Sequence, residues 1–280
     1  MLLRLVPEFR RAMDLSLALD AEGVQHELRS FGEEQWALVI ADEDAARAEA
    51  TLAAFERENP IARRPADVPE TAAGVAAGLM FFLAVVFFQV WTGPESSRSE
   101  WFARGSAEAE RILRGEWWRA LTALTLHADA GHAAGNAVLG GLLLALLSLR
   151  LGVGVANVVV LGSGFLGTLC AAELVRRGFT SVGASTAVFG ALGAVAVAQA
   201  LAPDSRRRAW IPLGAGVALL GFLGTGKRAD LAGHLCGFAA GMLLGFAAAR
   251  LPRLRNRLAQ AALTLAAAAA PVIAWWRAFR

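Results

Sequence analysis

Runs of about 20 apolar residues recur along this 280-residue chain and restrict it to one broad class of fold. A helix needs about 20 such residues to cross the hydrocarbon core of a bilayer. The runs begin near Ala72 and continue almost to the carboxy terminus. Because a backbone in lipid must satisfy its hydrogen bonds internally, we predict an all-α polytopic membrane protein.

We predict six spans and a possible seventh. They cover residues 72–92, 132–150, 155–176, 185–202, 209–225 and 231–250, with the possible seventh at 258–277, where Pro271 interrupts an alanine-rich run. Arginines concentrate in the loops on one side of these spans, which by the positive-inside rule is the cytoplasm. This cytoplasmic group comprises Arg63, Arg64, Arg150, Arg206, Arg207, Arg208, Arg250, Arg253, Arg255 and Arg257.

Residues 1–58 are predicted to form a small cytosolic α/β domain. The pattern favours a helix over 8–22, strands over 24–31 and 36–41, and a second helix that Asp42 caps and that runs to about residue 58. Because this charged stretch precedes the first span, we expect no amino-terminal signal peptide.

The rest of the chain divides into three further parts. A proline-containing linker at 59–71 separates the soluble domain from the membrane domain, so the two are expected to fold independently. The membrane domain covers 72–250. Residues 251–280 are expected to hold a basic loop and the additional transmembrane helix.

Composition argues against several classes of site. Cys170 and Cys236 both lie in apolar runs, where a thiol behaves as a small hydrophobic group, so we expect neither a disulfide nor a metal cluster. The calculated pI of 9.6 is high, but the arginines are scattered around the spans. Nucleic-acid binding is therefore a poor interpretation.

Four polar residues stand near the starts of three predicted spans. A histidine inside a membrane span is costly to bury and is a functional-site hypothesis by default. With the orientation above, the second, fourth and sixth spans all run from outside to inside. Their starts, which carry His132, Asn136, Ser185 and His234, are therefore expected at one level just below the outer surface.

Small residues predict that the fourth and sixth spans pack closely. The sixth span repeats glycine every four residues, and the fourth is rich in glycine and alanine, which lets helix backbones approach in lipid. The repeated glycines are Gly233, Gly237, Gly241 and Gly245.

Four segments in this order resemble the motifs of the rhomboid family of intramembrane serine proteases. The resemblance covers about residues 72–250. The segments are Glu116-Trp117-Trp118-Arg119, His132-Ala133-Ala134-Gly135-Asn136, Gly183-Ala184-Ser185 followed by Ala187-Val188-Phe189-Gly190, and Gly233-His234-Leu235-Cys236-Gly237-Phe238. It implies a rhomboid-like six-helix bundle, with the possible seventh span and the α/β domain as additions.

The resemblance also implies the roles of the site residues. Ser185 would be the nucleophile and His234 its base, in a dyad, because no acid is suitably placed in the matched motifs. His132, Asn136 and the Ser185 backbone N–H would stabilise the oxyanion. Phe189 corresponds to an aromatic position that packs against the catalytic histidine, although ordinary helix packing is nearly as good an explanation.

The remaining polar residues of the first loop are expected to be structural. Glu116 and Arg119 would fix that loop, with the tryptophans between them as interfacial anchors. His127, at the end of the loop, is expected to be surface or interfacial polar lining.

Thr186 departs from the family pattern, which usually has glycine after the nucleophile. Its branched side chain is expected either to crowd the oxyanion site or to alter the local backbone. Crowding predicts that Thr186→Gly raises the cleavage rate, a tolerant site predicts unchanged turnover, and a hydroxyl that donates to the oxyanion predicts a slower enzyme.

The expected function is therefore proteolysis of single-span transmembrane protein substrates near the outer face of a bacterial cytoplasmic membrane. The amino terminus would be cytoplasmic, and no cofactor is needed. The alternative is a catalytically inactive rhomboid-like protein that binds transmembrane helices, with Thr186 as its support. A transporter is disfavoured because internal repeats and broken helices are not evident. The partner of the soluble domain is not identified by the sequence.

Overall fold

The computed structural model describes residues 1–6, 9–31, 35–59, 70–201, 214, 230–251, 254 and 256–280. The chain divides into two compact units, Met1–Asp67 and Val68–Arg280. The predicted span at 209–225, apart from Gly214, and most of the predicted linker lie outside the described residues.

The first unit contains a three-stranded antiparallel sheet and two helices. Its elements are β1 (Leu2–Val6), α1 (Phe9–Ala21), β2 (His26–Ser30), β3 (Trp36–Ile40) and α2 (Ala45–Glu58). Strand β3 is central, since the order is β1-β3-β2. Trp36 pairs with Val6 on one side and with Ser30 on the other. Leucines of both helices, including Leu15, Leu19 and Leu52, pack on the buried Leu38 to form the core.

Two features of this unit differ from the predictions. The expected order of helix, strand, strand, helix omitted β1, whose hydrogen bonds come from β3 more than 30 residues later and are invisible to a local pattern. Asp42 does not cap the second long helix, because a 3₁₀ turn at Asp42–Asp44 comes first and α2 begins at Ala45.

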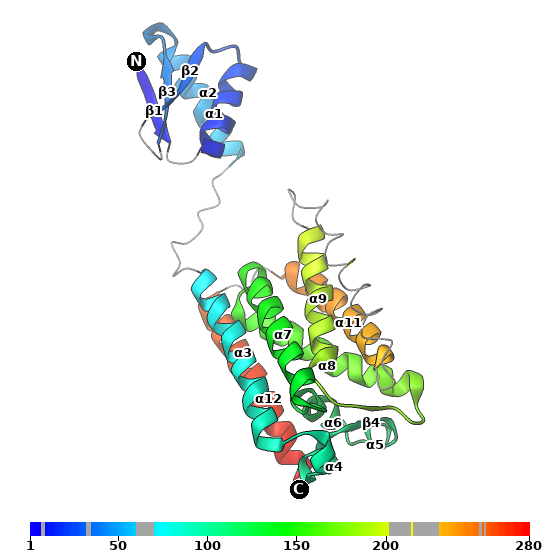
Figure 1. The fold of residues 1–280 in the computed structure, drawn as a ribbon. Coiled ribbons are helices and arrows are strands. Elements are labelled where there is room, and N and C mark those ends of the chain that lie inside the picture. The colour runs from blue at the N-terminus through cyan, green and yellow to red at the C-terminus, as the bar shows by residue number, and fades with distance from the viewer. Residues whose placement is uncertain are drawn as a thin grey trace. The chain divides into compact units, whose positions relative to one another are not determined.

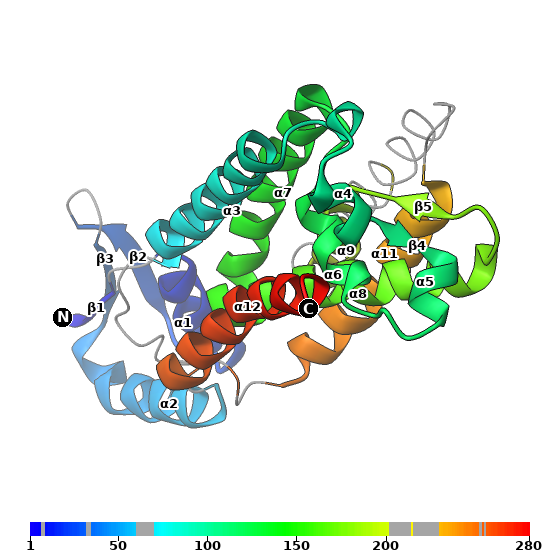
Figure 2. The ribbon, with the colours of Figure 1, turned by 90° about the horizontal axis from the view of Figure 1, so that it is seen from below.

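The second unit is a helical bundle with short helices at one end (Figures 1 and 2). Its long elements are α3 (Glu70–Thr92), α7 (Ala130–Leu151), α8 (Val153–Val175), α9 (Ser185–Ala200), α11 (Leu231–Ala249) and α12 (Arg257–Ala278). The end where α12 finishes also holds α4 (Glu100–Gly105), α5 (Ala109–Leu113), α6 (Arg119–Thr122), the 3₁₀ turns Glu95–Ser97 and Ala123–Thr125, and two paired strands, β4 (Ala107–Glu108) and β5 (Thr180–Ser181).

Five of the described helices are long and apolar enough to cross a membrane, namely α3, α7, α8, α11 and α12. The described part of α9 has 16 residues and is buried from Ser185 to Ala196. At 1.5 Å per residue this part is about 24 Å long, shorter than a hydrocarbon core of about 30 Å. Because its first 12 residues are buried, α9 is an interior helix, and its neighbours are α7, α8 and α11.

Close backbone packing joins α9 to α11, as the glycine repeat predicted. A Cβ atom at Gly241 would overlap the Gly190 carbonyl, and one at Gly245 would lie 2.9 Å from the Cα of Ala194. Gly233 differs from the rest of the repeat, because a Cβ there would meet the Asp230 carboxylate of its own helix instead of α9.

The buried guanidinium of Arg119 organises the short helices. It is 1% exposed, and it donates from Nε to Glu116 Oε2 at 2.5 Å and from Nη1 to the Ser106 carbonyl at 2.9 Å. A further Nη2 bond reaches the Ala103 carbonyl at 3.1 Å. A buried cation needs such partners to offset its desolvation, so the predicted loop-fixing contact between Glu116 and Arg119 is confirmed.

Helix α12 is fastened to the bundle at both ends. Near its start, Gln260 Oε1 accepts the Gly154 N–H at 2.6 Å, while its Nε2 donates to the Leu151 carbonyl at 3.1 Å, so one side chain caps the turn between α7 and α8. Near its end, Trp275 Nε1 donates to Thr125 Oγ1 at 3.0 Å, and its ring fills the space that a side chain at Gly105 would occupy.

Candidate active site

The starts of α9 and α11 bring a serine and a histidine into contact. Ser185 is the first residue of α9, and its Oγ lies 2.9 Å from Nε2 of His234, in the first turn of α11. Both residues are more than 90% buried. A hydroxyl held against a neutral imidazole can lose its proton to that ring, which is the minimum requirement for a serine nucleophile.

Asp230 fixes the start of the helix that carries His234, and Phe189 contacts the His234 ring. Asp230 caps α11 by accepting the Gly233 N–H at 2.7 Å, which fixes where the helix begins. The Phe189 ring, one turn after Ser185, stacks on the imidazole with 4.4 Å between centroids and 22° between planes. The expected aromatic contact with His234 is therefore confirmed.

The other ring nitrogen of His234 has no acidic partner in the described part of the chain. Nδ1 is buried, and no hydrogen-bond partner for it occurs among the described residues. A Ser-His-Asp triad would need a carboxylate at this nitrogen. The arrangement is therefore that of a two-residue pair.

Helix α7 places two side chains with N–H groups, the imidazole of His132 and the amide of Asn136, next to Gly183. Asp129 caps the helix by accepting the His132 N–H at 2.8 Å, and Asn136 follows His132 by one turn. A Cβ atom at Gly183 would lie 2.5 Å from His132 Cε1 and 3.4 Å from Asn136 Nδ2, so both side chains lie directly over this glycine.

Gly183 is required by this close approach and by its backbone. Its φ of +124° is a conformation that residues with side chains rarely adopt. Asn136 Nδ2 is buried, and no acceptor for it occurs among the described residues. A donor amide that points at the residue two before Ser185 is suited to bind a developing negative charge.

His127 is where the sequence prediction was wrong. It is not surface lining but fully buried, and its Nε2 accepts the Ala184 N–H at 3.2 Å. Its ring also meets the His132 ring edge to face, with 5.4 Å between centroids. Burial, helped by the neighbouring His132, lowers the pKa of His127 to about 4, so the ring is neutral near pH 7 and can accept.

Sequence reasoning missed His127 for a local reason. It precedes the first turn of α7, so no helical spacing relates it to His132 or Asn136. The only available signal was a second histidine five residues before His132, which by itself does not indicate burial.

Thr186 also differs from expectation. Its methyl carbon would lie 2.8 Å from a Cβ at Gly167 of α8 and 2.9 Å from a Cβ at Gly237 of α11. Thr186 is 1% exposed, and its methyl therefore fills a gap between helices that two glycines leave, away from Gly183. The sequence led us to expect this side chain to crowd the oxyanion site. The structure differs, because the Thr186 methyl packs in the interface between helices.

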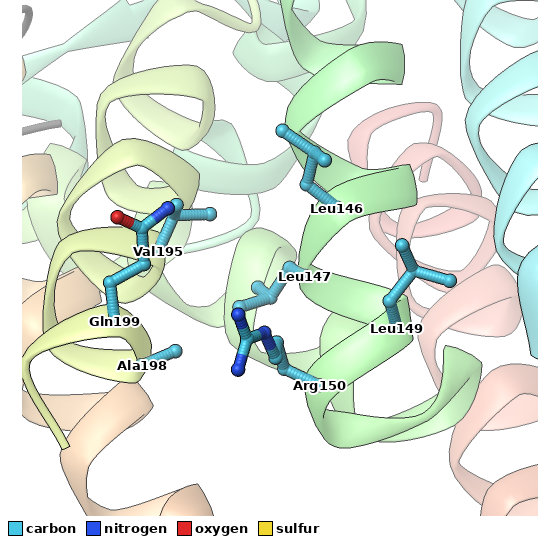
Figure 3. Close-up of a pocket in the computed structure, with 7 residues that line it drawn as sticks. All are labelled: Leu146, Leu147, Leu149, Arg150, Val195, Ala198 and Gln199. Carbon is cyan, nitrogen blue, oxygen red and sulfur yellow. The ribbon is translucent and has the colours of Figure 1, made fainter. Parts of the chain in front are cut away.

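A cavity elsewhere in the bundle is separate from this site. It has a volume of about 140 Å³ and lies between α7 and α9 (Figure 3), lined by Leu146, Leu147, Leu149, Arg150, Val195, Ala198 and Gln199. Arg150 is 18 residues after His132 on α7, or about 27 Å along the helix. The cavity therefore lies toward the end of α7 opposite to His132.

Part of the chain is similar to a known protein family and to a characterised relative. Residues 114–251 match the family model of the rhomboid domain, and this range includes His132, Asn136, Ser185 and His234. The rhomboid protease GluP of Bacillus subtilis (strain 168) is 33% identical over 117 residues. That similarity covers 42% of this chain and 22% of GluP, so the chain matches about a fifth of that relative.

Proposed function

Because this chain belongs to the rhomboid family, we propose that it is an intramembrane serine protease that uses a Ser185–His234 dyad. It hydrolyses peptide bonds in or next to the transmembrane segments of single-span membrane proteins. The observation that carries the proposal is the 2.9 Å contact between Ser185 Oγ and His234 Nε2 inside a helical bundle. The name of the Bacillus relative, a rhomboid protease, supports the same reaction class.

The first half of the reaction forms an acyl-enzyme. His234 Nε2 takes the proton from Ser185 Oγ while the oxygen attacks the scissile carbonyl carbon. The tetrahedral intermediate then collapses, the C–N bond breaks, and the imidazolium gives its proton to the leaving amine. Stacking against Phe189 keeps the ring in one orientation through both transfers.

The second half consumes water. His234 Nε2 takes a proton from a water molecule as the water oxygen attacks the ester carbon. The tetrahedral intermediate then collapses, the bond between the carbonyl carbon and Ser185 Oγ breaks, and the imidazolium returns its proton to Oγ, which regenerates the dyad. Water must reach the site from the outer side of the membrane, where the starts of α7, α9 and α11 would lie under the predicted orientation.

Three donors would stabilise the oxyanion in both halves. They are the side chains of His132 and Asn136 and the backbone N–H of Ser185. The first amides of a helix lack intrahelical acceptors, so the Ser185 N–H is available to a ligand at the start of α9. The loss of one such side-chain donor typically costs about 10²–10³ in rate.

The inactive alternative loses its main argument. Thr186 was its support, and the packing of that side chain against Gly167 and Gly237 explains the residue without disturbing the donors over Gly183. The bilayer is then the working environment, with the carboxy-terminal helix α12 and the amino-terminal unit as additions to the protease domain.

Labelling with a fluorophosphonate reporter tests the dyad. We expect the purified protein in detergent to be labelled on Ser185, and Ser185→Ala and His234→Ala each to abolish labelling. Ser148→Ala is the matched control, because Ser148 is also a buried serine and its hydroxyl donates to the Leu144 carbonyl of its own helix. Labelling that persists in folded Ser185→Ala protein would refute the assignment.

A further inference from the structure

We propose that His127 is a positioning residue for this reaction, which fixes both the amide that precedes the nucleophile and the ring that stabilises the oxyanion. The inference rests on the proposed function, since it concerns the same site. It assigns a task to a fully buried histidine that the Ser185–His234 chemistry does not itself use.

The first observation is the way the chain is held before Ser185. Strand β5 pairs Ser181 with Ala107 of the first loop, and the Gly183 N–H donates to the Ala123 carbonyl at 2.9 Å. The Ala184 N–H is the last amide before the nucleophile, and its acceptor is a side chain, Nε2 of His127. The backbone is thus held by hydrogen bonds at Ser181, Gly183 and Ala184, up to the start of α9.

The acceptor matters because Ala184 is buried. It is 3% exposed, and a buried N–H left without a partner loses its hydrogen bond to water without a replacement. Without His127, rotation of the Ala184 peptide unit toward another acceptor would become favourable. Any such turn would redirect the next amide, that of Ser185, which is the proposed backbone donor to the oxyanion.

The second observation is the contact between the two imidazoles. The His127 ring meets the His132 ring at 74° with 5.4 Å between centroids, and His132 in turn lies over Gly183. His127 therefore touches the side-chain donor and the backbone that precedes the nucleophile at the same time. Its burial and low pKa keep it neutral, which preserves the lone pair on Nε2 for the Ala184 N–H.

These contacts predict an effect on turnover more than on substrate binding. A misplacement of about 1 Å in a catalytic group can cost on the order of 10²-fold in rate. His127→Leu fills most of the ring volume but offers no acceptor, so we expect kcat to fall roughly 10- to 100-fold while KM changes less than about twofold. His127→Gln offers a side-chain oxygen as acceptor and should recover kcat to within about fivefold of the native protein.

The experiment measures cleavage of a model transmembrane substrate by the full chain in liposomes, with thermal unfolding recorded for each variant. His26→Leu is the control, since it removes a histidine of the first compact unit and should leave kcat unchanged. Native kcat in His127→Leu would overturn the inference, and so would a loss that is equal in the Leu and Gln variants. Ser185→Ala is run in parallel: cleavage that survives it refutes the protease assignment itself, a separate outcome.

Discussion

Thr186, at the residue scale, shows why the neighbour of a nucleophile must be judged by where its side chain points. A residue adjacent in sequence to Ser185 was expected to crowd the oxyanion site, but successive helical residues point about 100° apart. The Thr186 side chain consequently faces Gly167 and Gly237, while the proposed oxyanion donors lie over Gly183. The two glycines provide the space that a β-branched residue needs between three close helices.

Thr186→Gly is therefore expected to lower stability without raising turnover. Loss of a buried side chain leaves a cavity and adds a helical glycine, which together cost about 1–3 kcal/mol in the free energy of unfolding. Thr186→Val, which keeps the branched shape, should stay close to the native melting temperature. Thermal unfolding and cleavage are measured on the same detergent-purified samples, and a faster Thr186→Gly enzyme would restore the crowding hypothesis.

The contact between Ser185 and His234 could be predicted from the sequence for a reason that does not extend to His127. Ser185 and His234 are 49 positions apart, but the alternating direction of the spans alone places their helix starts at one level. His127 lies outside any span, and its burial depends on how the first loop folds over β5. Such loop packing leaves no periodic signal in the sequence.

At the scale of elements, hydropathy predicted the long helices well and the connections poorly. Helix α12 has the length and composition of a span, as the possible seventh span required. The short helices α4, α5 and α6 were not predicted, and the buried Arg119 of α6 connects this region by its bonds to Glu116, the Ser106 carbonyl and the Ala103 carbonyl of α4. Strand β1 was missed likewise because its partner is distant in sequence.

The attachment of α12 gives a prediction at this scale. Trp275→Phe removes the indole N–H that donates to Thr125 Oγ1, so we expect a loss of about 0.5–1.5 kcal/mol in the free energy of unfolding. Trp276→Phe is the matched control, since the adjacent Trp276 ring is 54% exposed and contacts Arg280. Equal melting temperatures for the two variants would show that the Thr125 bond contributes nothing.

At the scale of the whole molecule, the proposed chemistry lies within the second compact unit. Every residue of the proposed site, and every span-length helix among the described residues, belongs to Val68–Arg280. The sequence predicts a linker at 59–71 because charge and proline content change sharply before Ala72, and the two compact units meet at Asp67 and Val68. The sequence does not identify a partner for the Met1–Asp67 unit, and the described helices and strands of this unit pack around one apolar core.

Proteolysis of a transmembrane substrate tests the central claim most directly. The full chain is reconstituted in liposomes with a single-span substrate, and the products are identified by mass. We predict one main cut in or next to the substrate's transmembrane segment, lost in both Ser185→Ala and His234→Ala and retained in Ser148→Ala. Equal cleavage by the native protein and by a folded Ser185→Ala variant would contradict the account. A native protein that cleaves none of a panel of single-span substrates and is not labelled by a fluorophosphonate would contradict it as well.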